Sequence, residues 1–212
     1  MIIKTINLYQ KIKSATVLKD VNITLESGKI YGFVGENGSG KTMLFRTISG
    51  LMKHHSGQIL CDDMELYKDI NVIPNLGIVL ENAGLYPEYT GFQNLKFLSK
   101  INHKITDEQI EKSIERVGLN PKDKRTFSKY SLGMKQRIIL AQALMESPDV
   151  IMLDEPTNAL DENGVNLIRE IILEEKNRGA LILIASHNKE DINYLADVVY
   201  EVKNGEVTKR ND

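Results

Sequence analysis

The sequence predicts an α/β fold made of a core with a mixed sheet, an N-terminal antiparallel β-subdomain and an inserted α-helical subdomain. Residues 150–153 and 180–185 are continuous apolar runs, which are typical of parallel strands covered on both faces. The first third of the chain instead alternates apolar and polar residues between turn signals. From residue 90 to residue 145, strand patterns give way to helical spacing, which indicates the inserted subdomain.

The β-rich part comes first in the chain. Residues 2–8 and 21–25 alternate, and a Ser-Gly turn then leads into an apolar strand at 30–34. Two further short strands are expected at 57–60 and 76–80. These segments predict the β-subdomain and the first strands of the core.

Helices are predicted where apolar residues recur every three or four positions. These segments are 43–50, 94–101, 107–117, 135–145 and 164–177. Thr106 and Gln109 form a capping-box pattern that starts the middle helix of the inserted region. The helix at 164–177 is the crossover between the two buried strands. A hairpin at 198–209 closes the chain, with Asn204-Gly205, the dipeptide favoured by type I′ turns, at its tip.

Composition limits the classes of function. The 27 basic and 29 acidic side chains leave a net charge of −2, so nucleic acid, which requires clustered positive charge, is not an expected partner. Cys61 is the single cysteine, and the N-terminal residues show no secretory pattern, so we expect a cytoplasmic location. The apolar runs are far shorter than the roughly 18–20 residues that span a bilayer. Membrane association is therefore expected only through a partner.

The strand at 30–34 runs into the segment GENGSGKT, which matches the phosphate-binding pattern G-x-x-x-x-G-K-[ST] and precedes a predicted helix. Its glycines let backbone N–H groups approach phosphate oxygens that a Cβ atom would block. A flexible glycine turn is the alternative. The predicted nucleotide-binding residues here are Gly35, Glu36, Asn37, Gly38, Ser39, Gly40, Lys41 and Thr42. Lys41 would contact the β- and γ-phosphates, and Thr42 would ligate Mg²⁺.

Two adjacent carboxylates end the apolar strand at 150–153. Asp154 would hold Mg²⁺ through water, as the second acidic element of P-loop ATPases does. Strand alternation would aim Glu155 differently, towards the water that attacks the γ-phosphate, as general base or positioning group. A solvated strand end is the alternative for this pair alone. Together with GENGSGKT, the pair predicts a P-loop NTPase core.

Over essentially its whole length the chain resembles the nucleotide-binding subunit of an ABC (ATP-binding cassette) transporter. Residues 130–134, YSLGM, resemble the start of the family signature L-S-G-G-Q-x-x-R, and residues 158–161 resemble the loop that follows the second acidic motif. The resemblance implies that Tyr9 stacks on adenine, that Asp161 lies at the nucleotide and that His187 is the switch histidine. Ordinary strand packing is the alternative for Tyr9.

The signature segment offers a second phosphate cradle. Ser131 and Gly133 precede a predicted helix whose N-terminus suits a phosphate, with a plain helix cap as the alternative. One chain cannot easily use both cradles on one γ-phosphate. The resemblance therefore implies a head-to-tail homo- or heterodimer in which each signature covers the ATP held by the opposite subunit. Leu132 and Met134 depart from the signature, which leaves open a weakened site within a heteromeric pair.

His187 follows the strand at 180–185, on the same sheet edge as Asp154. An imidazole there could bond the γ-phosphate and orient the attacking water. The expected catalytic residues are therefore Glu155, His187 and Lys41.

One departure concerns the metal. The family usually has a glutamine after the strand at 76–80, and the matching residue here is Glu81. Its carboxylate can still bind Mg²⁺, although it adds negative charge near the phosphates. The expected metal ligands are Thr42, Glu81 and Asp154.

The resemblance implies an ATPase whose dimerisation around Mg·ATP powers separate transmembrane permease subunits from the inner face of the cell membrane. One ABC ATPase domain is expected over residues 1–212, with the ATP-binding core at 1–89 and 146–212 and the helical signature subdomain at 90–145. Leu85, Tyr86 and Tyr89 are candidates for contact with the membrane subunit, and packing within the helical subdomain is their alternative.

The departures resemble a subgroup that serves exporters of drugs, bacteriocins and lantibiotic-type peptides, so export is favoured over import. A soluble ABC-type ATPase of iron–sulfur assembly or regulation is the alternative function, and a non-hydrolysing ATP switch is a third. The transported substrate and the composition of the dimer are left open by the sequence.

Overall fold

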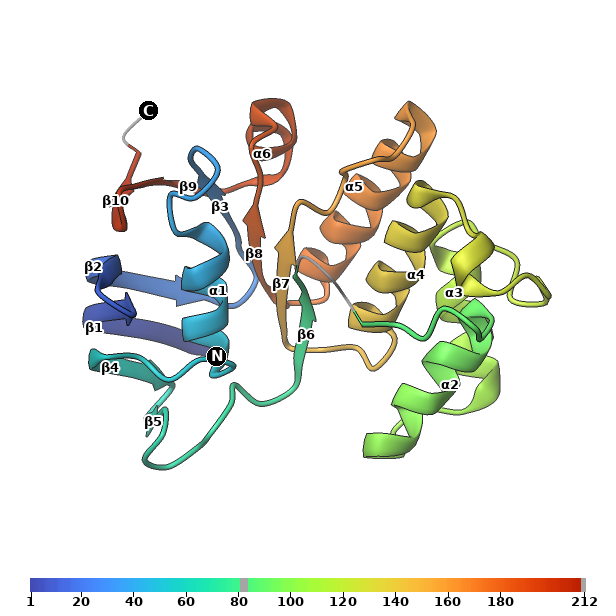
Figure 1. The fold of residues 1–212 in the computed structure, drawn as a ribbon, viewed down its shortest axis with the longest axis horizontal. Coiled ribbons are helices and arrows are strands. Elements are labelled where there is room, and N and C mark those ends of the chain that lie inside the picture. Colours follow the sequence, from blue (N-terminus) through green and yellow to red (C-terminus); the bar gives the residue numbers. More distant parts are fainter. Residues whose placement is uncertain (81–83, 211–212) are drawn as a thin grey trace.

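The computed structural model describes residues 1–80 and 84–210 and confirms the predicted α/β fold with its mixed sheet, antiparallel β-subdomain and inserted helices. In Figure 1 the antiparallel sheet, helix α1 (Lys41–Ser49) and the mixed sheet follow one another as layers. The long helices of the second half of the chain lie beyond the mixed sheet. The phosphate-loop segment thus lies between two sheets, at the start of the helix that separates them.

The antiparallel sheet has the strand order β2-β1-β4-β5. Its strands are β1 (Ile2–Ile12), β2 (Ala15–Glu26), β4 (Ser56–Cys61) and β5 (Met64–Glu65). Ile3 pairs with Leu25 on one side and with Cys61 on the other, and all three side chains are buried. Strands β1 and β2 are longer than the alternation predicted because polar residues near the hairpin turn hide the pattern.

The mixed sheet has the strand order β10-β9-β3-β8-β7-β6. Its strands are β3 (Ile30–Val34), β6 (Leu76–Val79), β7 (Val150–Asp154), β8 (Leu181–Ala185), β9 (Val198–Lys203) and β10 (Glu206–Lys209). Neighbours from β9 to β6 are parallel, and β10 is antiparallel to β9. At the β9–β10 turn, Asn204 and Gly205 have φ values of 51° and 83°, as the predicted type I′ turn requires.

The helices after α1 fall into two groups. Three long helices and one short 3₁₀ segment occupy residues 90–145, and two helices flank β8. Their bounds are α2 (Gly91–Asn102), α3 (Asp107–Arg116), η1 (Phe127–Lys129), α4 (Leu132–Leu144), α5 (Glu162–Asn177) and α6 (Lys189–Leu195). The predicted capping box at Thr106 is present, and Thr90 forms a second one that starts α2 earlier than predicted.

Two hydrophobic clusters cover the two faces of the mixed sheet. Leu183 faces a cluster shared with the antiparallel sheet and with Leu44 and Phe45 of α1. The next residue, Ile184, faces a second cluster that includes Ile138 of α4 and other residues of the helical subdomain. This arrangement explains why β7 and β8 are apolar at successive positions: both faces are buried.

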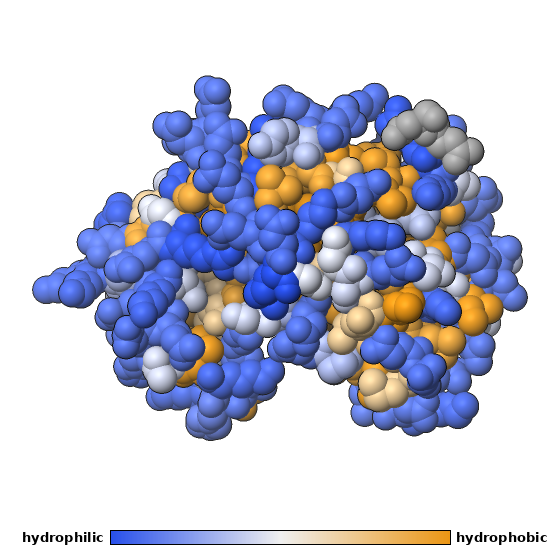
Figure 2. Space-filling view, turned by 180° about the vertical axis from the view of Figure 1, so that it is seen from behind, coloured by the Kyte–Doolittle hydropathy of each residue, from blue (hydrophilic) through white to orange (hydrophobic). Residues whose placement is uncertain are grey.

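The face drawn in Figure 2 is mostly hydrophilic, with hydrophobic side chains gathered in separate patches. Some large apolar side chains are well exposed, among them Ile101 and Leu132 in the helical subdomain at 73% and 70%. Within residues 1–80 and 84–210, the helices are either too short or too polar to cross a membrane.

Candidate nucleotide-binding site

The phosphate loop connects β3 to α1, and two of its glycines cannot be replaced without strain. A Cβ atom on Gly35 would lie 2.2 Å from the Val202 carbonyl oxygen. Gly40, the N-cap of α1, has a φ of 116°, and a Cβ there would lie 2.9 Å from the Val17 carbonyl oxygen. Glycine is therefore needed at both positions for the loop to pass between β2 and β9. The same lack of a Cβ atom leaves the backbone N–H groups of the loop available to an anion.

Two polar side chains of the loop fit a bound phosphate. Lys41 is 7% exposed, and its ammonium donates to the carbonyl oxygens of Gly35 and Glu36 at 2.7 and 3.1 Å, which keeps the charge inside the loop. The buried hydroxyl of Ser39 makes no hydrogen bond within the described part of the chain. A buried cation beside an unpaired hydroxyl suits the oxygens of a polyphosphate.

The start of α1 meets the end of β7 at the predicted magnesium ligands. Thr42 Oγ1 donates to Asp154 Oδ2 at 2.6 Å, and the Asp154 side chain is buried. The described residues contain no group of three or more His, Cys, Asp or Glu side chains that could hold a metal ion. Thr42 and Asp154 offer two oxygens side by side, and Mg²⁺ is usually held by few protein oxygens together with waters and substrate phosphates.

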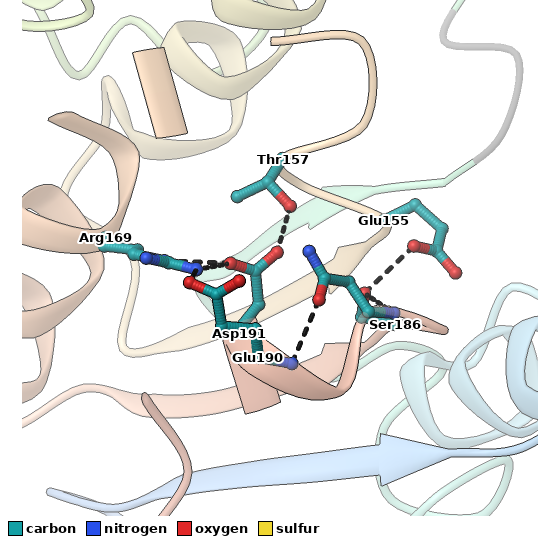
Figure 3. Close-up of polar contacts among 7 residues, drawn as sticks. Glu155, Thr157, Arg169, Ser186, Glu190 and Asp191 are labelled. Carbon is teal, nitrogen blue, oxygen red and sulfur yellow. Dashed lines mark hydrogen bonds and ion pairs between the residues drawn. The ribbon is translucent and has the colours of Figure 1, made fainter. Parts of the chain in front are cut away.

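The predicted catalytic carboxylate and the predicted switch histidine are in direct contact. Glu155 Oε1 accepts from the His187 backbone N–H at 2.9 Å and lies 2.8 Å from His187 Nδ1. The other carboxylate oxygen accepts from Ser186 Oγ at 3.0 Å, a contact shown in Figure 3. Glu155 itself has a φ of 51°, a left-handed conformation that costs a side-chain-bearing residue of the order of 1–3 kcal/mol. The fold thus holds Glu155 in a strained, well-defined position.

The loop and the histidine line one hollow, which we call the phosphate hollow. Its volume is about 560 Å³, and residues 35–39 line it together with Ser186, His187 and the β9–β10 turn. Three cations, Lys189, Lys203 and Arg210, and two carboxylates, Glu36 and Glu201, also line it. The small excess of positive charge favours a polyanionic ligand.

The signature residues lie elsewhere on the same chain. Ser131 is the N-cap of α4 and accepts from the Met134 N–H at 3.2 Å, and Gly133 is in the first turn of that helix. Asp161 similarly caps α5, accepts from the Gly164 N–H and is largely exposed. Ser131, Gly133 and Asp161 do not line the phosphate hollow of their own chain. Lys41 and Glu155 do not line it either, but Lys41 donates to Gly35 and Glu36, and Glu155 accepts from Ser186 and His187, all of which line it.

Tyr9 lines a separate hollow that borders the β9–β10 turn. It lies on β1 opposite Ser56 and lines a second hollow of about 660 Å³, which we call the outer hollow, together with Lys11, Lys19 and residues of β10. The outer hollow and the phosphate hollow share no lining residue. The β9–β10 turn contributes Asn204 to the phosphate hollow and Glu206 to the outer hollow, and the stacking role of Tyr9 stays a prediction. Glu81 lies outside the described residues.

Some residues of the site carry no recognisable sequence motif. Ser186 holds the Glu155 carboxylate, and Gln136 donates to the carbonyl oxygens of Glu155 and Pro156, both at 3.3 Å. Each comes from a segment far from Glu155 in the chain. In the sequence, Ser186 is marked by its position next to His187, and Gln136 by its position within the signature region.

Comparisons with known proteins show the family to which the chain belongs. The model of a family described as ABC transporter matches residues 18–158. The chain is 50% identical to the uncharacterized ABC transporter ATP-binding protein YybJ of Bacillus subtilis (strain 168), over 96% of this chain and 93% of that one. It is 36% identical to the bacitracin transport ATP-binding protein BcrA of Enterococcus faecalis, over 99% of this chain and 72% of that one.

A similar fold is found in the dimeric structure of a bacterial ABC transporter cassette, with a TM-score of 0.88, 21% identity and coverage of 99% of this chain and 98% of that one. The chain therefore belongs to the ABC transporter family, as an ATP-binding and ATP-hydrolysing subunit.

Proposed function

We propose that the chain binds Mg·ATP in the phosphate hollow, closes with a second ATPase subunit around two nucleotides and so powers export by separate transmembrane permease subunits at the inner face of the cell membrane. The observation that carries this proposal is the meeting of three segments at one sheet edge. Lys41 and Thr42 come from α1, Asp154 and Glu155 from the end of β7, and His187 from the end of β8.

The residues divide the chemistry among them. Lys41 and the loop N–H groups bind the phosphates, and Mg²⁺ held by Thr42 and Asp154 would neutralise charge on the β- and γ-phosphates. Glu155 is held by Ser186 and His187, so its carboxylate can accept a proton from the attacking water or orient that water. His187 is 64% exposed at its side chain, which leaves its ring accessible to a γ-phosphate.

A second subunit supplies the other half of each site in this proposal. The side chains of Leu132 and Asp161 are 70% exposed, at the starts of α4 and α5 respectively, so this surface is available to another molecule. The N-terminus of α4 carries the positive end of the helix dipole and suits the γ-phosphate of a nucleotide held by the partner. We propose that residues 90–145 move as one unit when the two subunits close.

The permease contact is assigned to an aromatic cluster at the point where the chain enters the helical subdomain. Tyr89 lies 5.7 Å from Tyr86 and 4.9 Å from Phe97 between ring centroids, and Tyr86 and Phe97 are 54% and 44% exposed. Exposed aromatic groups of this kind are enriched at protein interfaces. Leu85 instead packs against the hydrophobic cluster of the helical subdomain, so we assign the contact to the rings.

The proposed cargo class is peptide antibiotics, because a similar chain, BcrA, is named as a bacitracin transport ATP-binding protein.

The variant Glu155→Gln tests the proposed site. It keeps the shape of the side chain but removes the base, so kcat should fall by about 10²-fold or more while ATP still binds. Purified variant protein should accumulate as an ATP-bound dimer in size-exclusion chromatography. The exposed Glu170 provides the control Glu170→Gln, which should hydrolyse ATP at the wild-type rate. Brisk hydrolysis by Glu155→Gln would remove Glu155 from its role.

A further inference from the structure

A buried charged network lies beside the proposed catalytic pair. Asp191, in the first turn of α6, has no exposed surface. Its carboxylate accepts from Thr157 Oγ1 and from Arg169 Nε and Nη2, the last two at 2.8 and 2.5 Å. Figure 3 shows these three side chains converging from the loop after β7, from α5 and from α6. We call them the Asp191 network.

Neighbouring side chains shield the Asp191 network from solvent. The Arg169 side chain is 11% exposed, and its guanidinium lies 5.0 Å from the ring centroid of Tyr194 on α6. Glu190 also contacts it at 3.3 Å. Because hydrogen bonds inside a protein are stronger and more restrictive than those in water, such a network fixes the elements that contribute to it.

The Asp191 network joins the same two segments as the catalytic contact. Thr157 follows Glu155 by two residues, and Asp191 follows His187 by four residues. The β7–β8 ladder and the hydrogen bond from the Glu155 N–H to the Ala185 carbonyl oxygen already join the two segments. Side chains connect them in two further places: Glu155 with Ser186 and His187, and Thr157 with Asp191. Two connections over so short a distance leave little freedom for one segment to slide past the other.

The two side-chain connections differ in exposure. In the catalytic one Ser186 has no exposed surface, but the side chains of His187 and Glu155 are 64% and 17% exposed. Thr157 and Asp191 are 8% and 0% exposed. The connection between Thr157 and Asp191 is therefore the more fully buried one, and it can keep the segments in register when water or a ligand competes for Glu155 and His187.

We propose that Asp191, through Thr157, is a positioning residue that holds Glu155 and His187 in register for ATP hydrolysis; this inference rests on the catalytic roles proposed above. Asp191 is buried, so it acts through the two catalytic segments and does not touch the nucleotide. Small displacements of a catalytic group reduce rate strongly, by about 10²-fold for 1 Å.

The test uses Thr157, because Asp191 keeps its Arg169 partner when the threonine hydroxyl is removed. Thr157→Val preserves the branched shape but not the hydrogen bond, and Thr157→Ser preserves the hydrogen bond. We expect Thr157→Val to lower kcat by about tenfold with KM for ATP changed less than about twofold, because only alignment is lost. Thr157→Ser should retain at least about half of the wild-type kcat.

A matched control removes a buried threonine hydroxyl elsewhere. Thr5 is 3% exposed and donates to the Val21 carbonyl oxygen in the antiparallel sheet. Thr5→Val should lower the melting temperature without lowering kcat measured well below that temperature. The proposal is overturned if Thr157→Val has wild-type kcat, if it changes KM as much as kcat, or if Thr157→Ser is as slow as Thr157→Val.

Glu155→Gln separates this inference from the proposed function. If Glu155→Gln hydrolyses ATP briskly, the proposed catalytic role of Glu155 is wrong and the positioning role falls with it. If Glu155→Gln is inactive but Thr157→Val is fully active, the proposed function stands and the positioning role alone is wrong.

Discussion

Neighbouring side chains on β1 point to opposite faces of the antiparallel sheet. Gln10 is 3% exposed and donates to the Lys53 carbonyl oxygen, whereas Tyr9 is half-buried and lines the outer hollow with Lys11 and Lys19. The strand thus directs the Tyr9 ring to the outer hollow, which borders the phosphate hollow at the β9–β10 turn. A tyrosine upstream of the glycine loop is a recognisable pattern, but strand alternation decides where its ring goes.

The variant Tyr9→Ala tests the predicted adenine contact, because the outer hollow that the Tyr9 ring lines borders the phosphate hollow at the β9–β10 turn. Loss of a base–aromatic stack would cost about 1–3 kcal/mol, which is roughly 5- to 150-fold in affinity. Calorimetric titration with a non-hydrolysable ATP analogue measures this loss. Lys41→Ala is the positive control for weakened binding, and an affinity of Tyr9→Ala within about twofold of wild type would remove the adenine role.

Residues that act within one short motif could be predicted from the sequence, and residues that act through contacts could not. Thr42 ends the phosphate-loop motif at the start of α1, and Asp154 ends the apolar strand β7, so both could be recognised in the sequence. Their side chains are hydrogen-bonded in the structure. Ser186, Thr157 and Asp191 contact the proposed catalytic segments from other elements. Only the packing of β7, β8 and α6 reveals those pairings.

At the scale of the element, length and periodicity decided what could be predicted. The buried strands β7 and β8 and the long helix α5 carry continuous or periodic apolar patterns, and all three are present. Helix α6 has seven residues and strand β5 has two, so neither shows enough of a period to be recognised. Helix α2 begins at Gly91, because Thr90 and Gln93 form its N-terminal capping box. Glycine is a poor helix former, so its place at the first helical position obscures this capping pattern in the sequence.

An ion-pair cluster ties the helical subdomain to the core at the element scale. Arg116 of α3 contacts Glu175 and Glu174 of α5 at 2.5 and 2.8 Å, and Arg178 also contacts Glu175. Glu175 is buried at 4% exposure, whereas the Glu174 side chain is 65% exposed. Only the buried carboxylate satisfies two guanidinium groups that are themselves partly shielded.

The variant Glu175→Gln should therefore destabilise the protein by about 1–3 kcal/mol, because it weakens hydrogen bonds to two charged groups. For a chain of this size, each kcal/mol shifts the melting temperature by about 2–4 °C. Glu174→Gln removes the same charge from an exposed position and should shift it by less than about 2 °C. Equal shifts for the two variants, measured by thermal unfolding, would show that burial at this cluster does not matter.

At the scale of the whole molecule, the two helix starts that we propose to bind phosphate lie in different parts of the chain. The phosphate loop starts α1 between the two sheets, and Ser131 starts α4 in the helical subdomain. Ser131 does not line the phosphate hollow of its own chain, although its backbone and hydroxyl suit a phosphate. A second molecule can bring the two together, which is why we propose that each complete site is shared.

Mixing two inactive variants tests this sharing. Lys41→Ala disables the loop of a chain, and Ser131→Arg blocks the start of α4 with a bulky side chain, so each variant alone should lose nearly all ATP hydrolysis. A mixed dimer contains one site built from the intact loop of one chain and the intact Ser131 of the other. If half of the dimers are mixed and each has one working site, the mixture should recover about a quarter of wild-type phosphate release. Recovery depends on exchange of subunits, so unfolded or non-exchanging protein is recognised by size-exclusion chromatography of differently tagged chains. Mixed dimers that form but stay inactive, or a Ser131→Arg variant with full activity, would show that the start of α4 is not part of the hydrolytic site.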